Sequence, residues 1–300
     1  MGNYIDLHCH SSFSDGHLTV KEIITNAKEN GVKGLSITDH DDIRSIKEVK
    51  NLKENDIIIV AGTEFSTTLN FKGKVYYMHL LGYGFDESHS RIVKMIQHYL
   101  DNRFINNITF FDKIQEFGIE IPECLFKEVK LENYNLIIKE MVLALYKNNY
   151  SEEYIATFLK KIKPFTPDYE GYEVDTIEAI NAINEAGGIA VVPHLQQIEA
   201  TDSELIEIIN YLSKNRVRGI EVFHSETTGE QMKRYHDLSE EFNILVSVGS
   251  DFHCFGEDNK VIGHGIDDNL CITQCSLFDY LIDQNLIINK NIEKRRLNSE

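Results

Sequence analysis

The chain has 300 residues, of which 42% are hydrophobic and 26% are charged. This composition is typical of a globular chain with one large domain, or with one domain that carries an insertion, and it argues against intrinsic disorder. Acidic residues outnumber basic ones by 48 to 30, and the formal net charge of -18 opposes the binding of a long polyanion through a broad basic surface. A small phosphorylated substrate stays compatible with this charge, because metal ions add local positive charge that a formal count omits.

The cysteines and the start of the chain indicate a cellular compartment. The five cysteines are Cys9, Cys124, Cys254, Cys271 and Cys275. Their number is odd and no two form a Cys-x-x-Cys pair, so the sequence indicates neither a disulfide framework nor a zinc ribbon. The first residues lack the basic flank and the apolar core of a signal peptide, and no run reaches the ~18 apolar residues of a membrane span. We therefore expect a cytoplasmic protein without a membrane partner.

Strands and helices alternate in the first part of the chain. The segment Tyr4–His10 begins as an apolar strand, and a helix follows over Leu18–Gly31, where Thr19 and Glu22 form a capping box and Gly31 ends the helix. Hydrophobic periodicity then predicts a strand, a helix and two strands: Val32–Thr38, Arg44–Glu54, Asp56–Val60 and Lys74–Tyr83. Alternation of short buried strands with amphipathic helices is typical of a parallel sheet.

A helical insertion interrupts this alternation. Over residues 86–163 the strand signal disappears, and apolar residues such as Ile92, Met95 and Ile96 recur at helical spacing. Pro164 and Pro167 mark the exit, because proline interrupts helices. The sequence therefore predicts an α/β domain in two segments, 1–85 and 164–287, a helical insertion over 86–163, and a polar tail over 288–300.

The alternation resumes after the insertion. The predicted helices are Val174–Ala186, Ser203–Ser213 and Gly229–Phe242, and the predicted strands are Gly188–Val192, Val217–Phe223 and Ile244–Val248. Each helix precedes a strand, as the α/β pattern requires.

Metal-competent side chains stand at the ends of the short apolar runs. His8 and His10 are spaced i, i+2 at the end of the first strand, so they share a face and can bind one metal ion. The same arrangement recurs at Asp39, His40, Glu64, His194, Asp251 and His253. In a parallel (β/α) barrel the C-terminal strand ends converge on one face, where such barrels keep their active sites. The sequence therefore predicts a polynuclear metal site and metallohydrolase activity, and imidazole with carboxylate suits Mn, Zn or Fe.

Four further residues have two interpretations each. His79 lies in mid-strand, where a lone histidine is as often a satisfied core or edge residue as a ligand. His224 ends a strand on the same face. It either contacts the substrate or the metal ligands, or it is a packing residue. His264 is either a hydrogen-bond donor at the barrel mouth or a residue without a role there. Arg103, in the insertion, either faces a phosphate group or is solvated.

These residues resemble the motifs of the polymerase and histidinol phosphatase (PHP) family of metal-dependent phosphoesterases. The motifs, in chain order, are His8-x-His10, Ser14-Asp15-Gly16, Thr38-Asp39-His40, Gly62-Thr63-Glu64, His194 and Gly249-Ser250-Asp251-Phe252-His253. The resemblance covers most of the chain apart from the insertion. It implies a distorted (β/α)7 barrel with an inserted helical subdomain and a site for three divalent transition-metal ions. By resemblance, one ion is held by His8, His10, Glu64 and Asp251, a second by Glu64, His79 and His194, and a third by Asp15, His40 and His253.

Within the family the chain is most similar to the nucleotide-phosphatase branch, which shares an inserted helical subdomain and the Gly263-His264 element. That branch usually has Arg and His in an insertion helix for phosphate binding, where Ile138-Lys139-Glu140-Met141 stands here. It also tends to have Pro-Gly-Arg after the histidine at 194, where Leu195-Gln196-Gln197 stands here. Lys139 offers a point charge in place of the planar fork of arginine, so the resemblance leaves the phosphate-binding residues open.

The sequence thus predicts a phosphoesterase that hydrolyses a small phosphomonoester, such as a nucleotide with a terminal phosphate, through a metal-bridging hydroxide. The candidates for proton transfer are Asp251, His194 and His253, and the candidates for substrate binding are Lys139, Arg103, His224 and His264. No extended nucleic-acid surface is expected. Two alternatives stay open: carbon–nitrogen hydrolysis, because amidohydrolases share the barrel and metal arrangement in outline, and a metal-containing module that binds a ligand without catalysis.

Overall fold

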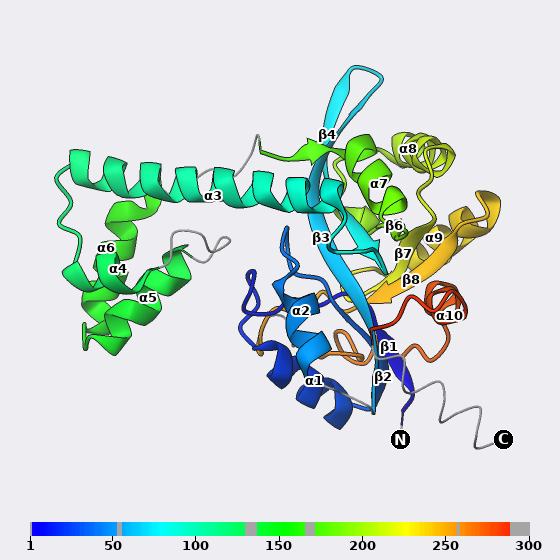
Figure 1. Ribbon diagram of the computed structural model, residues 1–300, viewed down its shortest axis with the longest axis horizontal. Coiled ribbons are helices and arrows are strands. Elements are labelled where there is room, and N and C mark those ends of the chain that lie inside the picture. The colour runs from blue at the N-terminus through cyan, green and yellow to red at the C-terminus, as the bar shows by residue number, and fades with distance from the viewer. Residues whose placement is uncertain (1, 53–55, 130–136, 166–171, 257–258, 289–300) are drawn as a thin grey trace. The chain divides into compact units, whose positions relative to one another are not determined.

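The computed structural model describes residues 2–52, 56–129, 137–165, 172–256 and 259–288, without the side chain of Lys139 (Figure 1). The chain divides into two compact units. The first, here called the sheet unit, consists of residues 1–95 and 174–300, and the second, the helical unit, consists of residues 96–173. The long helix α3 (Ser90–Glu116) begins in the sheet unit and continues into the helical unit.

The helical unit has a hydrophobic core of its own. Besides most of α3 it contains α4 (Glu123–Glu128), α5 (Ile137–Lys147), α6 (Glu152–Ile162) and a 3₁₀ turn at Lys163–Phe165. Its core includes Phe110, Ile114, Leu125 and Met141. Met141, at which the chain departs from the family pattern, is therefore a core side chain of this unit.

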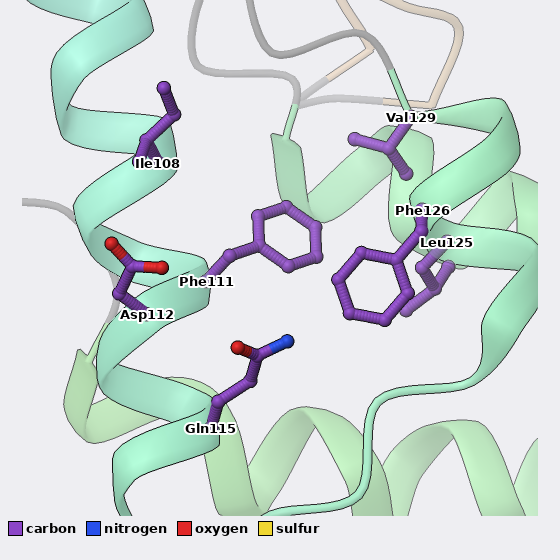
Figure 2. Close-up of a pocket in the computed structure, with 7 residues that line it drawn as sticks. All are labelled: Ile108, Phe111, Asp112, Gln115, Leu125, Phe126 and Val129. Carbon is purple, nitrogen blue, oxygen red and sulfur yellow. The ribbon is translucent and has the colours of Figure 1, made fainter.

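A mostly apolar pocket of about 200 Å³ opens between α3 and α4 of the helical unit. Figure 2 shows the rings of Phe111 and Phe126 facing each other across it, with their centroids 5.7 Å apart. Asp112 and Gln115 contribute its polar groups.

The sheet unit is built on an eight-stranded mixed sheet with the order β1-β2-β3-β4-β6-β7-β8, and β5 pairs with β3. The strands are β1 (Tyr4–Asp6), β2 (Val32–Ile37), β3 (Ile58–Phe71), β4 (Lys74–Tyr83), β5 (Val174–Asp175), β6 (Ile189–Val192), β7 (Gly219–His224) and β8 (Leu245–Gly249). All pairs are parallel except that β4 runs antiparallel to both β3 and β6. The expectation of a parallel sheet is therefore wrong at β4.

A tight hairpin accounts for the reversal at β4. β3 does not end at Val60, as expected from its apolar run, but continues to Phe71, and beyond Phe65 its side chains alternate between more and less buried positions. Lys72 and Gly73 follow with φ angles of +52° and +81°. Two consecutive left-handed residues make the two-residue turn whose twist matches antiparallel strands, so no crossover helix is needed.

The first and last strands of the sheet path also meet. The Leu7 N–H donates to the Val248 carbonyl at 2.9 Å, and the Asp251 N–H donates to the His8 carbonyl at 2.8 Å. Cys9 forms a parallel bridge with Phe252. The segments that follow β1 and β8 therefore lie side by side, and both carry predicted metal ligands.

The helices of the sheet unit are α1 (Val20–Glu29), α2 (Arg44–Asn51), α7 (Thr176–Glu185), α8 (Asp202–Lys214), α9 (Gly229–Glu241) and α10 (Ser276–Asp283). The capping box of Thr19 and Glu22 is confirmed at the start of α1, and Gly31 lies just past its end with a φ of +76°. α10 has no counterpart among the predicted elements. Among the described residues, no helix is long and apolar enough to cross a membrane.

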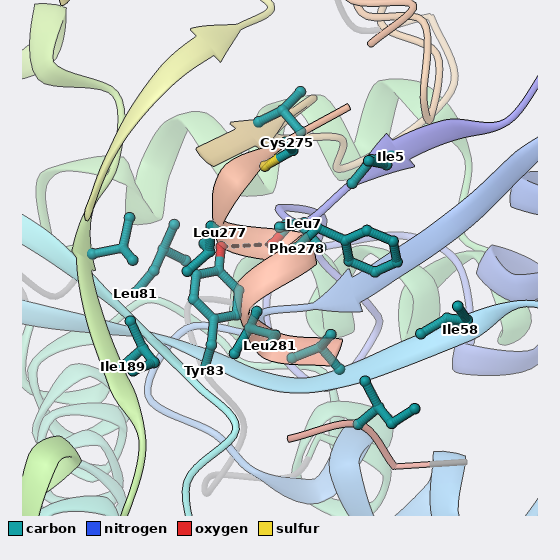
Figure 3. Packing of buried hydrophobic residues seen from close by; sticks show 14 of the residues in the cluster. Ile5, Leu7, Ile58, Leu81, Tyr83, Ile189, Cys275, Leu277, Phe278 and Leu281 are labelled. Atoms are coloured by element: carbon teal, nitrogen blue, oxygen red, sulfur yellow. Dashed lines mark hydrogen bonds between the residues drawn. The ribbon is translucent and has the colours of Figure 1, made fainter. Parts of the chain in front are cut away.

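The core of the sheet unit supports the backbone at His8. Figure 3 shows Leu81, Ile189, Leu277 and Leu281 packed around Tyr83, whose side chain is fully buried. A buried tyrosine needs a partner for its hydroxyl, and the Tyr83 hydroxyl donates to the Leu7 carbonyl at 2.8 Å. This bond fixes the chain one residue before His8.

Candidate metal centre

Histidine and carboxylate side chains from the strand ends of the sheet unit gather in one cluster, here called the metal centre. It contains His8, His10, Asp15, His40, Glu64, His79, His194, Asp251 and His253. The structure thus brings together every residue that the family resemblance assigned to a metal ion. Most of these side chains are buried, so their ring nitrogens and carboxylate oxygens face one another rather than water.

Glu64 lies in the middle of the metal centre. Its Oε2 atom lies 3.1 Å from His8 Nε2 and 3.2 Å from His10 Nε2. The same oxygen lies 3.3 Å from His40 Nδ1. Burial alone would raise the pKa of Glu64, but the charges of the histidines around it, His8 first, hold that pKa well below its usual value.

The other oxygen of Glu64 faces a different pair of histidines. Glu64 Oε1 lies 2.9 Å from His79 Nδ1 and 2.8 Å from His194 Nε2. The two ring nitrogens are themselves 3.3 Å apart. An ionised carboxylate whose two oxygens face separate groups of imidazoles can bridge two cations.

Asp251 completes the group around His8 and His10. Its Oδ1 atom lies 3.4 Å from His8 Nε2 and 3.2 Å from His10 Nε2. The ligand atoms of His8, His10, Glu64 and Asp251 all lie within 4.8 Å of one another. These four buried residues match the first ligand set implied by the family resemblance.

A third group forms around Asp15. Asp15 Oδ1 lies 3.3 Å from His253 Nε2, and Asp15 Oδ2 lies 3.6 Å from His40 Nε2. His10 also faces this group, with its Nδ1 atom 3.6 Å from Asp15 Oδ1 and its ring stacked on that of His253 at 4.2 Å. His10 therefore presents one ring nitrogen to each of two groups, whereas the resemblance assigned it to one.

Asp39, which was expected among the strand-end candidates, supports the loop that carries Asp15. The Asp39 carboxylate accepts hydrogen bonds from the Ser11 N–H at 2.8 Å and from the Ser14 hydroxyl at 2.8 Å. Both serines lie in the segment between His10 and Asp15. Asp39 thus fixes that segment and is not one of the grouped ligands.

Glu221 contacts two of the candidate ligands and was not predicted from the sequence. Its Oε1 atom accepts a hydrogen bond from His8 Nδ1–H at 3.0 Å, and its Oε2 atom accepts one from the His194 N–H at 2.8 Å. Gly249 allows this close approach, because a Cβ atom there would overlap with His8 and with Glu221. The available signal was a glutamate between the apolar residues Ile220 and Val222 of strand β7. Histidines that bind a metal ion through one ring nitrogen typically donate the other ring N–H to such a carboxylate, which orients the ring.

The contact with Glu221 provides a test of whether the centre fits a metal ion. Because His8 Nδ1 carries the hydrogen, its Nε2 lone pair is directed at the oxygens of Glu64 and Asp251, at 3.1 and 3.4 Å. A lone pair that faces two carboxylates is stable only with a cation or a proton between them. The donor chemistry of His8, Glu64 and Asp251 therefore fits a divalent ion.

His224 touches the second oxygen of Asp251. Its Nδ1 atom accepts hydrogen bonds from the Glu226 N–H at 3.1 Å and from Gln196 Nε2–H at 2.9 Å. The ring hydrogen is therefore on Nε2, which lies 3.5 Å from Asp251 Oδ2. Gln196 belongs to the segment that departs from the family pattern, so this departure fixes the orientation of His224.

Lys260 is a second residue that the sequence interpretation missed. Its side chain is 4% exposed, and its Nζ atom lies 2.7 Å from Glu226 Oε1 and 3.9 Å from Asp251 Oδ2. It also donates to the Asp251 carbonyl at 3.5 Å. A lysine in a polar loop is usually a surface residue, and therefore no signal in the sequence indicated this position.

Of the remaining substrate candidates, His264 lies apart from the metal centre. His264 contacts the Asn30 carbonyl through Nε2 at 3.1 Å, and Asn30 directly precedes Gly31 and β2, whereas the metal centre lies past the C-terminal strand ends. Arg103 is buried in α3 within the helical unit. Lys139 lies in α5, and its side chain is outside the described residues.

The profile of the PHP domain family matches residues 6–157, which is just over half of the chain. The chain belongs to the PHP domain family. The family resemblance drawn from the histidine and carboxylate motifs is therefore confirmed. With the cluster of metal-competent side chains described above, this PHP chain is a metal-dependent phosphoesterase, as its sequence predicts.

Curated relatives extend over most of the chain. A 5'-3' exoribonuclease of Haemophilus influenzae is 27% identical over 83% of this chain and 89% of its own length. A 3',5'-nucleoside bisphosphate phosphatase of Chromobacterium violaceum is 25% identical over 87% of this chain and 90% of its own length.

A solved structure shares the fold. A protein of Chromobacterium violaceum, described as an amidohydrolase with bound sulfate and no metal, has a TM-score of 0.70 to this chain. The likeness covers 95% of this chain and 97% of that one, at 24% sequence identity. It shows that the mixed α/β arrangement recurs in another protein.

Proposed function

We propose that this PHP phosphoesterase hydrolyses a small phosphomonoester, and that a nucleotide with a terminal phosphate is its substrate class. The observation that carries the proposal is the convergence of five imidazole nitrogens on the two oxygens of one buried carboxylate, Glu64. Such a site concentrates cations, and cations bind and activate phosphoryl groups. The names of the bisphosphate phosphatase and the exoribonuclease among the relatives point to nucleotide phosphates.

The proposed centre holds three divalent transition-metal ions. One set is His8, His10, Glu64 and Asp251, a second is Glu64, His79 and His194, and a third is Asp15, His40 and His253. The close contacts within each set support this division. Nitrogen and oxygen donors together suit Mn, Zn or Fe.

The residues of the chain have separate tasks in the proposed reaction. When bound, the ions supply a nucleophile from water at neutral pH and stabilise charge on the phosphoryl oxygens. Glu221 keeps the Nε2 lone pair of His8 directed into the centre. His224 and Lys260 contact Asp251 Oδ2, which leaves Oδ1 for a cation. Burial alone would raise the pKa of Asp251, but the charge of nearby His8 holds it well below the usual value, so this carboxylate stays ionised. Asp251 is the first candidate for a role in proton transfer, because its Oδ2 atom lies 3.5 Å from His224 Nε2.

Proton transfer through His194 or His253 is the proposed second route. His194 lies against Glu64 Oε1, and His253 lies against Asp15 Oδ1, so each ring reaches the centre from a different side. His224 is proposed as the substrate-side neighbour of this relay through its contact with Asp251.

The proposed architecture is a distorted (β/α)7 barrel in two segments, 1–85 and 164–287, with a helical insertion over 86–163. The hydrogen bonds between the ends of β1 and β8 support closure of the sheet. The helical unit at 96–173 supports the insertion, and we assign phosphate recognition within it to Lys139 and Arg103. A cytoplasmic location is supported by the five cysteines, all within the described residues, because none forms a disulfide.

Phosphate release from a defined substrate panel tests the function. The panel contains a nucleoside 3',5'-bisphosphate, a nucleoside 5'-monophosphate, a short RNA and an amide, each with Mn²⁺. We expect inorganic phosphate from the bisphosphate above all. Nucleotide release from the RNA, ammonia release from the amide, or full metal occupancy without any turnover would each overturn the proposal in favour of a nuclease, an amidohydrolase or a binding module.

Two matched variants test the role of Glu64. Glu64→Gln removes the carboxylate that faces both groups of histidines, so kcat/KM should fall at least about a thousandfold and more than one ion should be lost. His79→Asn removes a ligand of one group and should cost about tenfold to a hundredfold. Equal losses of activity and of metal content in the two variants would contradict a bridging role.

A further inference from the structure

A second group of metal-competent side chains lies outside the metal centre, in the segment 261–271. The ligand atoms of His264, Asp268 and Cys271 lie within 4.8 Å of one another. His264 Nδ1 lies 2.7 Å from Asp268 Oδ1 and 3.6 Å from Cys271 Sγ. Nothing in the proposed reaction uses these three residues together.

This group lies at the N-terminal ends of the first two strands, away from the metal centre. The ring of His264 packs edge-on against Tyr4, with the ring centroids 4.8 Å apart, and its Nε2 atom contacts the Asn30 carbonyl at 3.1 Å. Tyr4 begins β1 and Asn30 precedes β2, whereas His8 and His10 follow β1. The two groups of ligands therefore belong to opposite ends of the same strands.

The contact with Asn30 decides which nitrogen of His264 is available. A carbonyl oxygen only accepts hydrogen bonds, so Nε2 carries the ring hydrogen. In the neutral ring the Nδ1 lone pair then points toward the carboxylate of Asp268 and the sulfur of Cys271. Metal-binding histidines typically donate their other ring N–H to a backbone carbonyl in this way.

The distances fit a tetrahedral ion. With metal–nitrogen and metal–sulfur bonds of about 2.0 and 2.3 Å, the nitrogen and the sulfur of a zinc site are about 3.5 Å apart. The distance from His264 Nδ1 to Cys271 Sγ is 3.6 Å. The distance of 2.7 Å from His264 Nδ1 to Asp268 Oδ1 is shorter than a zinc site requires. The side chain of Asp268 is 76% exposed, however, and is free to move outward.

The backbone that carries the three residues is fixed by its own hydrogen bonds. The Gly265 N–H donates to the Val261 carbonyl at 2.8 Å, and the Leu270 N–H donates to the His264 carbonyl at 2.9 Å. Leu270 is buried in the core of the sheet unit. The ligands are therefore brought together before any ion binds, which lowers the entropic cost of binding.

We propose that His264, Asp268 and Cys271 form a separate binding site for one divalent transition-metal ion, with Zn²⁺ preferred and water as the fourth ligand. A thiolate beside an imidazole and a carboxylate favours Zn²⁺ over Mn²⁺. The metal centre, in contrast, offers nitrogen and oxygen donors. The ion would join three residues of the segment 264–271, and the ring of His264 contacts Tyr4 and the Asn30 carbonyl.

Cobalt substitution tests the site in the full-length protein. The protein is stripped with a chelator under reducing conditions and titrated with Co²⁺ alone, and the near-ultraviolet charge-transfer band of a thiolate–cobalt bond is recorded. We expect this band in the wild-type protein and in Glu64→Gln, which alters the metal centre. We expect its loss in Cys271→Ser, and at least a tenfold weaker Co²⁺ affinity in His264→Gln.

Cys254→Ser is the matched control, because Cys254 is partly buried like Cys271 but follows His253 of the metal centre. The band should persist in this variant. No band in the wild-type protein, a band that survives Cys271→Ser, or a band lost in Cys254→Ser would overturn the proposal, and the first result would leave His264 and Asp268 as a simple ion pair.

A second measurement uses the wild-type chain and does not depend on the folding of a variant. Zn²⁺ should slow the alkylation of Cys271 at least about tenfold, because a coordinated thiolate is a poor nucleophile. Cys124, in the helical unit, should react at the same rate with and without Zn²⁺. Equal protection of both thiols, or of neither, would contradict the site.

Discussion

Glu221 is the residue at which the structure adds most to the sequence. It accepts hydrogen bonds from the side chain of His8 and from the backbone of His194, two residues that approach Glu64 from different sides. Glu221→Gln keeps the size of the side chain but removes its charge and one acceptor. We expect metal affinity or kcat/KM to fall about tenfold to a hundredfold, as is typical for carboxylates behind a metal-binding histidine.

The measurement is metal titration of the purified variant together with its kinetics on a phosphomonoester. Glu178→Gln, an exposed position in α7, is the control for the chemical change itself. If the two variants bind metal and turn over substrate equally well, Glu221 has no role in orienting His8.

Metal binding should compete with protons at His10. Burial alone would lower its pKa, but the contacts with Asp251 and Glu64 and the charge of Asp15 raise it to about 10 in the metal-free protein. The protonated ring therefore contributes stability that is fully present below pH 6.5 and is lost as the pH rises through about 10. A ligand must lose this proton, so metal affinity should increase with pH across the same window.

Calorimetric titration at three pH values within this window measures the affinity. Titration in two buffers with different ionisation enthalpies counts the protons that are released, and we expect at least about one per chain. An affinity that does not change with pH would show that His10 is not a ligand.

The sequence indicated the candidate ligands but not the residues that contact them from outside the cluster. His8, His10, Glu64 and Asp251 stand at the ends of apolar runs, and this position is visible in the chain itself. Glu221 acts from inside a strand and Lys260 acts from a polar loop, so each could be recognised only once the fold had brought it to the centre.

At the scale of elements, the sequence predicted the start of a helix well where a side chain caps it. The capping box at Thr19 is present, and the Glu22 N–H donates to the Thr19 hydroxyl at 3.3 Å. The β3–β4 hairpin was missed because the apolar run ends before the strand does. Past Phe65 the burial of β3 alternates, and the Lys72-Gly73 turn was the only local sign of a reversal.

The same capping box supports a prediction on stability. Thr19→Ala removes the hydroxyl that accepts from the first turn of α1, so the free energy of unfolding should decrease by about 1 kcal/mol. Thr25→Ala, in the same helix, removes an exposed hydroxyl that donates to the Lys21 carbonyl and should change the free energy by less than about 0.5 kcal/mol. Urea unfolding of both variants gives the comparison, and equal effects would contradict the capping role.

At the scale of the whole molecule, the sheet unit and the helical unit each have a separate hydrophobic core. The change from alternating strands and helices to helices alone predicted such a division. The boundaries were less certain in the sequence, because α3 runs without a break from one unit into the other. Periodicity does not change inside a continuous helix, and therefore it cannot mark a boundary there.

The division predicts that metal removal acts on one unit. Within the described residues, all groups that can hold an ion lie in the sheet unit. An ion at a thousand times its dissociation constant adds about 4 kcal/mol of stability to the unit that binds it, which corresponds to about 8–16 °C in melting temperature. A chelator should therefore lower the melting temperature of the sheet unit by this amount for each saturated site.

Hydrogen exchange assigns the effect to a unit, because it reports on each backbone amide. On chelation we expect faster exchange in β6, β7 and β8, which lead into the metal centre, and unchanged exchange in α5 and α6. Re-addition of Mn²⁺ should restore the slow exchange of the strands. Equal acceleration in the strands and in α5 and α6 would show that the two units unfold as one, because loss of the ions would then destabilise both cores together.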